Sequence, residues 1–140
     1  MHSRKHEILL FIAIIIAIFS YNQYSNTQQQ YAASLSEGLI LASNIKSDVS
    51  NYYMMNGHFP NNKTDIHLAD FKPSPKTAIS AIDILEGGII QVSYNKRSGF
   101  SNHTLQLIPD DSNNAYGINW VCVTSSKKIT SLIATCDYLP

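Results

Sequence analysis

The sequence predicts an α+β fold in which one long N-terminal helix packs on a four-stranded antiparallel sheet. Two observations favour the helix: residues 8–19 form an unbroken apolar run, and no proline and only one glycine, Gly38, occur before Gly57. A third favours the sheet, because apolar residues after Ala78 recur two positions apart, as on a strand with one buried face. Together they predict a helix that covers one face of a sheet.

The composition excludes several classes of protein. The chain has 140 residues, which limits it to one modest domain, and its ten basic and ten acidic residues give a formal net charge of zero. A neutral chain is not expected to bind nucleic acid over its whole surface, because the phosphates require a basic surface. With 44% hydrophobic residues, disorder is not expected either.

The apolar run predicts a membrane segment. Arg4 and Lys5 precede it, so this end should stay in the cytoplasm while everything after about Tyr21 is exported. Such a run spans roughly 20 Å as a helix, less than the roughly 30 Å of a hydrocarbon core, and a cleaved signal peptide is therefore the alternative. Because residues 19–22 offer a poor cleavage site, we expect residues 1–30 to anchor the chain and residues 31–140 to form an exported head.

The helical pattern continues past the apolar run to about Tyr53. Its second half carries one apolar stripe at spacings of three and four, which is expected to cover the sheet. The stripe consists of Leu35, Leu39, Ala42, Ile45, Val49 and Tyr52. Asn56 and Gly57 predict a left-handed C-terminal cap, and Pro60 opposes any continuation of the helix.

Four short strands are expected after a loop at residues 61–75. Their alternating apolar residues are Ile82 and Ile84; Ile90, Val92 and Tyr94; Leu105 and Leu107; and Ile118, Trp120 and Cys122. Turns at residues 86–88, 98–102 and 109–117 would connect these strands as an antiparallel meander.

No pattern of an enzyme, metal or cofactor site is present in the sequence. The histidines at positions 2, 6, 58, 67 and 103 lack the spacing of a metal-binding helix, and residues 110–114 lack the spacing and the glycine of a calcium loop. The two cysteines, Cys122 and Cys136, cannot form a four-ligand zinc site. We therefore expect a protein that is not an enzyme.

Four short motifs, in this order, resemble those of the type IV pilins. Residues 36–43 (Ser-Glu-Gly-Leu-Ile-Leu-Ala-Ser) are similar to the family's helix segment, and residues 52–60, ending Asn-Gly-His-Phe-Pro, to its helix exit. Residues 117–122 (Gly-Ile-Asn-Trp-Val-Cys) resemble the strand with the first disulfide cysteine, and residues 138–140 (Tyr-Leu-Pro) the C-terminal motif. The resemblance implies a lollipop-shaped subunit with a helix, a four-stranded sheet and a C-terminal disulfide loop.

The resemblance also implies roles for single residues. Counting back without gaps from residues 36 and 37 places Glu7 where the family has a glutamate that pairs with the terminal amine of a neighbouring subunit. The alternative is that Glu7 stays solvated beside Arg4 and Lys5. A disulfide is expected between Cys122 and Cys136 in an exported head, with two free thiols as the alternative. The residues between the two cysteines resemble the family's exposed variable loop. The two lysines of this segment are expected to be solvated, and DNA binding is the alternative.

Some positions depart from the family pattern. His2 and Ser3 stand where a Gly-Phe processing junction would lie, and Arg4, Lys5 and His6 stand where apolar residues would enter a filament core. A start codon placed too late would explain the missing leader. The family's helix-loosening Gly and Pro are replaced by Ile16 and Tyr24, and Cys136 precedes the Tyr-Leu-Pro motif instead of following it.

Two functions are therefore expected. In the first, the protein is a pilin or minor pilin, a structural subunit of a surface filament used in adhesion, twitching motility or DNA uptake. In the second, it is an unprocessed pilin-like protein of the inner membrane, with its head in the periplasm, that regulates or assists pilus assembly. Its partners would be other pilin subunits, the inner membrane and the assembly machinery. A third, less expected function is that of a periplasmic binding module released by signal peptidase.

Overall fold

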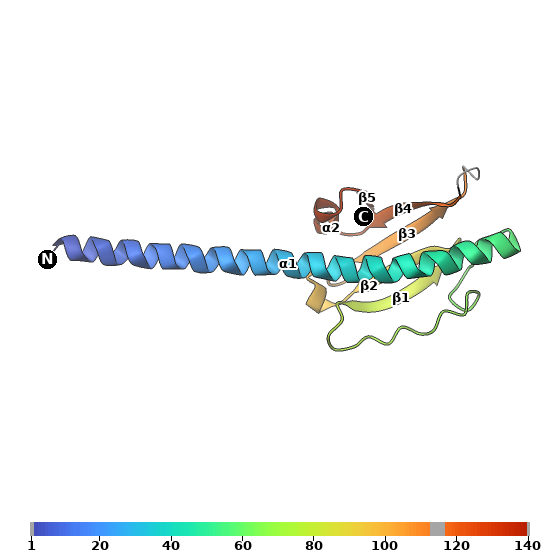
Figure 1. Ribbon diagram of the computed structural model, residues 1–140, viewed down its shortest axis with the longest axis horizontal. Helices are drawn as coiled ribbons and strands as arrows, with labels where there is room; N and C mark the ends of the chain where they lie inside the picture. Colours follow the sequence, from blue (N-terminus) through green and yellow to red (C-terminus); the bar gives the residue numbers. More distant parts are fainter. Residues whose placement is uncertain (1, 113–116, 140) are drawn as a thin grey trace.

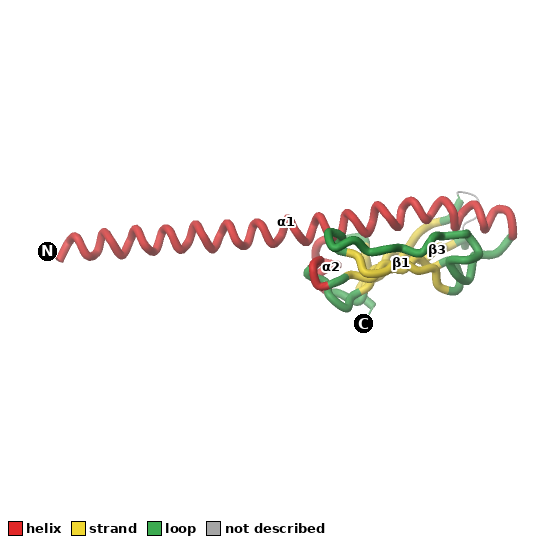
Figure 2. The backbone as a smooth tube through the Cα atoms, turned by 90° about the horizontal axis from the view of Figure 1, so that it is seen from below, coloured by secondary structure: helices red, strands yellow, loops and turns green. Residues whose placement is uncertain are grey.

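One long helix dominates the computed structural model, which describes residues 2–112 and 117–139. This helix, α1 (His2–Asn56), has 55 residues and a length of about 80 Å. Its C-terminal half packs on the head, and its N-terminal half projects away as a stalk (Figures 1 and 2). The helix is continuous through the polar segment at residues 22–30 and is longer at both ends than the sequence predicts.

The end of α1 is capped as predicted. Gly57 adopts φ 72°, and its N–H donates to the carbonyl of Tyr53 at 2.8 Å. Pro60 follows as a buried residue whose carbonyl accepts from the N–H of Gly88 at 2.8 Å. The chain that leaves the helix is therefore tied at once to the far end of the sheet.

The sheet has five strands within the described residues, one more than predicted. The strands are β1 (Ile79–Leu85), β2 (Ile89–Tyr94), β3 (Thr104–Asp110), β4 (Asn119–Thr124) and β5 (Cys136–Tyr138). They lie in the order β1-β2-β3-β4-β5, and the first four pair antiparallel as the alternation predicts. The fifth strand pairs parallel to β4, so the sheet is mixed. The α+β fold class is confirmed, and the strand count and the purely antiparallel sheet are corrected.

The fifth strand exists because the chain does not form a simple loop between the cysteines. After β4 it enters a short helix, α2 (Lys127–Leu132), and returns in the same direction as β4. A parallel return requires such a crossover, and three residues are too few for an alternating pattern to be visible. The segment between Cys122 and Cys136 is therefore not a loop throughout, because its lysines begin a helix, although both lysines are exposed as expected. Residues 113–116 of the third predicted turn lie outside the described residues.

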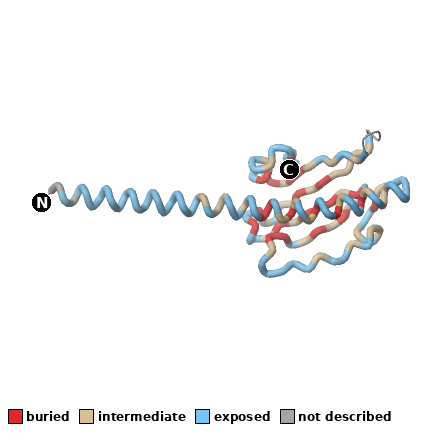
Figure 3. Tube along the Cα trace, in the orientation of Figure 1, coloured by how far each residue is buried: buried red, intermediate tan, exposed pale blue. Residues whose placement is uncertain are grey.

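The core lies between the stripe of α1 and one face of the sheet, as predicted (Figure 3). Leu35, Ala42, Ile45 and Val49 are buried in it, while Leu39 and Tyr52 at the margins are half-buried. The sheet contributes alternate residues, among them Ile82, Ile84, Ile90, Val92, Tyr94, Leu105 and Leu107. Trp120 packs partly against this core.

Gly38 is the one glycine within α1, and the packing explains it. A Cβ at this position would lie 2.3 Å from Oη of Tyr94, whose side chain is 3% exposed. Within the described residues, this Oη is the buried polar side-chain atom that has no hydrogen-bond partner. Burial, and then the charge of Glu37, raise the pKa of Tyr94 above its usual range, so the phenol stays neutral.

Replacing Gly38 by alanine should therefore destabilise the head. Alanine gains about 1 kcal/mol of helix propensity, but overpacking a buried site costs about 1–3 kcal/mol. Urea unfolding of the full chain in detergent micelles, followed by the fluorescence of Trp120, measures the change. Ser36→Ala at an exposed position is the control, and Tyr94→Phe should restore part of the lost stability in the double variant. A Gly38→Ala head as stable as the wild type would contradict the contact.

Candidate functional site

The stalk presents an apolar surface that nothing in the head covers. Its large apolar side chains between Ile8 and Phe19 are each 48–67% exposed. Such a patch exceeds what a monomeric protein in water tolerates. In the described part of the chain, one helix is long and apolar enough to cross a membrane by length and composition. The stalk must therefore be covered by lipid or by other protein chains.

Charged residues mark the free end of this stalk. Glu7 lies one position before the apolar segment and one helical turn after Arg4, and both side chains are exposed. Glu7 is on the half of α1 that projects from the head, whereas Cys122 and Cys136 are in the head (Figure 1). The structure thus does not bring the predicted site residues together, and they belong to two separate regions.

Two tyrosines follow the apolar segment on the side of the head. Tyr21 is 73% and Tyr24 is 66% exposed, and they lie about one turn apart. Aromatic rings of this kind are enriched where a membrane segment passes the headgroups. The two tyrosines therefore give the stalk a boundary between an apolar part and a polar part.

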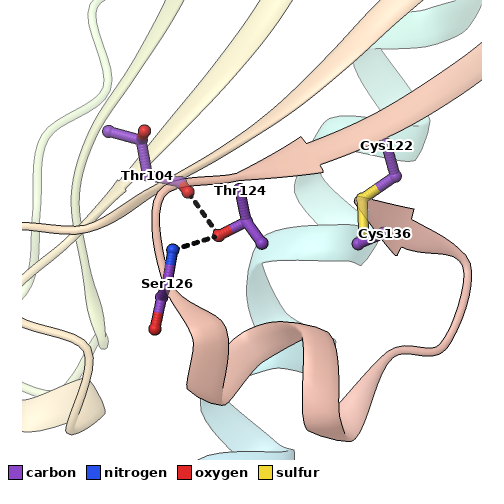
Figure 4. Close-up of a disulfide and its surroundings, with 5 residues drawn as sticks. All are labelled: Thr104, Cys122, Thr124, Ser126 and Cys136. Carbon is purple, nitrogen blue, oxygen red and sulfur yellow. Dashed lines mark hydrogen bonds between the residues drawn. A yellow bond between two sulfur atoms is a disulfide. The ribbon is translucent and has the colours of Figure 1, made fainter. Parts of the chain in front are cut away.

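The disulfide between Cys122 and Cys136 attaches β5 to the edge of the sheet (Figure 4). Beside it, Oγ1 of Thr124 donates to the carbonyl of Thr104 at 2.7 Å and accepts from the N–H of Ser126 at 3.2 Å. Thr124 is 2% exposed, so these bonds satisfy a buried hydroxyl at the point where the chain leaves β4 for α2.

The end of the head nearest the stalk is built from α2 and from a 3-10 turn, η1 (Lys96–Ser98). Gln30 of α1 donates through Nε2 to the carbonyl of Arg97 at 2.8 Å. Nζ of Lys128 lies 3.3 Å from the ring centroid of Tyr31, a cation–π contact. Both segments therefore hold α1 where it enters the head.

These contacts are not predicted by the sequence. Lys128 is expected there to be a solvated loop lysine, because a contact between residues so far apart in the chain leaves no local pattern. In the structure, Gly99 shows how closely this end of the head packs on α1: it adopts φ 78°, and a Cβ there would overlap the ring of Tyr31. A glycine required by such a close approach indicates that another element packs on it.

Glu37 connects α1 to the start of the sheet. Its carboxylate accepts from Oγ1 of Thr77 and, at 3.1 Å, from the N–H of Ala78. Asn95 donates from Nδ2 to the carbonyl of Thr77 at 3.0 Å. Glu37 is thus a structural carboxylate, held by groups that fix the entry to β1.

Comparison with known proteins gives one result that bears on this architecture. A family model described as "Pilin (bacterial filament)" matches residues 33–140. The match covers the second half of α1, the whole sheet and the disulfide region. A search of curated proteins returned no match.

Proposed function

The chain belongs to the pilin family of bacterial filament proteins, and on that premise we propose that it is a membrane-anchored structural subunit of a surface filament. The observation that carries the proposal is the exposed apolar stalk joined to a pilin head. The residues before about position 31 serve as the anchor, and the remainder is the exported head. Its uses are those of such filaments: adhesion, twitching motility or DNA uptake.

Assembly would transfer the stalk from lipid to a bundle of stalks. Lipid tails are as apolar as the side chains at residues 8–19, so this step gains little from the hydrophobic effect. Close packing of helices and the pairing of polar groups must supply the stability and the register. The apolar surface therefore makes assembly possible without deciding how neighbouring subunits align.

Glu7 is the residue proposed to decide the alignment. A carboxylate within an apolar bundle is tolerated chiefly when it is paired. The cation proposed for it is the terminal amine of a neighbouring subunit, a role implied by its position relative to the pilin helix. An unpaired Glu7 would oppose transfer into the bundle, so assembly would proceed only in the paired register.

Arg4 favours a second function. Its guanidinium is exposed one turn before Glu7, and its burial among apolar helices would be costly without a partner. This cost opposes entry into a fibre and favours a chain that remains in the inner membrane. There it would regulate or assist assembly through contacts with pilin subunits and the assembly machinery, without entering the fibre.

The mature N-terminus distinguishes the two functions. Intact mass and N-terminal sequencing should be carried out on protein from the membranes, and from sheared surface filaments, of its own host. A chain that begins at or near Ser3 in the sheared fraction is the result expected for a filament subunit. An intact Met1 confined to the inner membrane would establish the assembly factor instead, and a start near Tyr21 in the soluble fraction would contradict both.

A further inference from the structure

Four cations lie beside α1 at the end of the head that faces the stalk. They are Lys96, Arg97, Lys127 and Lys128, named here the basic collar, and all four side chains are exposed. The first two lie in η1 and the others in α2, the two segments that contact α1 at Gln30 and Tyr31. Figure 2 shows α2 at the end of the head from which the stalk emerges.

Little negative charge accompanies the basic collar. From position 20 to position 36 the helix carries no charged residue, and residues 94–107 have no carboxylate. Residues 117–139 contribute one, Asp137 on β5. Glu37 lies at this end as well, but its carboxylate accepts from Thr77 and Ala78. Glu86, in the turn before β2, and Asp111, which accepts from Oη of Tyr53 at 2.7 Å, lie toward the far end of the sheet. The collar is therefore a local excess of positive charge although the whole chain is neutral.

The position of the collar along α1 can be compared with the membrane boundary. Tyr24 is the second of the two tyrosines that mark the boundary, and Tyr31, which touches the collar, lies seven residues further on. Seven residues of helix rise about 10 Å. Charges interact over about 8 Å at physiological ionic strength, and the lysine and arginine side chains extend from the backbone. The collar is thus within reach of lipid headgroups.

The length of the membrane segment strengthens this contact. Residues 8–24 span about 26 Å as a helix, somewhat less than a hydrocarbon core of about 30 Å. A short segment is accommodated by local thinning of the bilayer or by drawing flanking residues toward it. The second response brings the collar closer to the headgroups.

We propose that the basic collar binds the anionic phospholipids of the membrane in which the stalk is embedded, and so holds the head on the membrane surface before the subunit leaves the bilayer. The proposal rests on the membrane-anchored state described under the proposed function. Lipid is favoured over other polyanions because the collar lies beside the helix at the end of the head that faces the membrane. Departure from the bilayer would then require these contacts to be released.

The test uses the full chain reconstituted in vesicles of phosphatidylcholine and phosphatidylglycerol. Electron spin resonance of spin-labelled lipids gives the preference of the protein for phosphatidylglycerol over phosphatidylcholine. The test variant combines Lys96→Glu with Lys127→Glu. The matched control combines Lys63→Glu with Lys72→Glu, which makes the same charge change at two lysines of the loop between α1 and β1. Arg4 and Lys5 are present in every chain, so the differences report on the head.

We expect a preference of roughly threefold in the wild type, because each cation near an anionic surface adds to the attraction. The collar variant should lose most of it, the control variant should keep it, and high salt should weaken it. Equal preferences in the wild type and the collar variant would overturn the proposal.

Two further measurements identify a different occupant of the collar. In the first, the protein is reconstituted in vesicles of phosphatidylcholine alone and mixed with duplex DNA. If the DNA sediments with the wild type but not with the collar variant, and the wild type shows no lipid preference, the proposal is overturned in favour of nucleic acid. Collar-dependent cross-linking between copies, again without lipid preference, would assign the collar to a contact between subunits. If the wild type fails to float with vesicles of either composition, the membrane-anchored state fails, and that result is distinct from a floating protein without lipid preference.

Discussion

Replacing Glu7 by alanine is expected to abolish filament assembly while leaving the head folded. Glu7 lies on the projecting half of α1, so its loss removes no contact of the core. The substitution does remove the carboxylate proposed to pair with the terminal amine of a neighbouring subunit, and with it the interaction that selects the register. In a strain whose only copy carries Glu7→Ala, we expect no filaments in the sheared fraction. The amount of the protein in the inner membrane should be normal.

The matched control is Glu86→Ala, which removes an exposed carboxylate from the turn between β1 and β2. This variant should assemble as the wild type does. Circular dichroism of both purified variants checks that the head is intact. Normal filaments from Glu7→Ala would show that this carboxylate does not determine the register, and would favour its simpler role as a solvated residue beside Arg4.

Removing the disulfide is expected to produce the largest loss of stability. Cys122→Ser combined with Cys136→Ser opens a crosslink between residues 14 positions apart, which costs roughly 3 kcal/mol in the loop-entropy model. Without it, β5 depends on three residue pairs with β4 and on a bond of 2.9 Å from the N–H of Leu139 to the carbonyl of Thr124. So short a strand at the edge of a sheet has little independent stability.

Urea unfolding followed by Trp120 fluorescence measures this loss, with the oxidised wild type as the reference. A reducing agent should lower the unfolding midpoint of the wild type and leave that of the serine variant unchanged, which separates the disulfide from other effects of the substitutions. If the serine variant unfolds at the wild-type midpoint, the crosslink contributes nothing to the stability of the head.

Most of the architecture could be predicted because its signals are local. The stripe from Leu35 to Val49 has the period of a helix with one buried face, and Ile90, Val92 and Tyr94 have the period of a strand. Gly57 marks the helix end by the conformation that it adopts. Each of these signals depends only on neighbours in the chain, and each is confirmed.

The remainder could not be predicted because it depends on contacts between distant segments. Three residues of β5 contain too little pattern to indicate a strand, and its parallel direction follows from the crossover through α2. The cation–π contact of Lys128 with Tyr31 has no sequence signal at all. The sequence shows that Gly38 is a glycine within a helix, but the reason for it, the close approach of the Tyr94 phenol, lies on another element.

The order of the strands has a consequence for how the exported chain matures. Each strand pairs with the strand before it in the sequence, so a chain exported behind its N-terminal anchor presents every new strand to a partner that is already outside. Local pairings of this kind form fast. The exception is β5, whose parallel pairing requires α2 to form first and whose crosslink requires an oxidant. Oxidation is therefore the last step of maturation, and a reduced head would be a late precursor with β1 to β4 already in register.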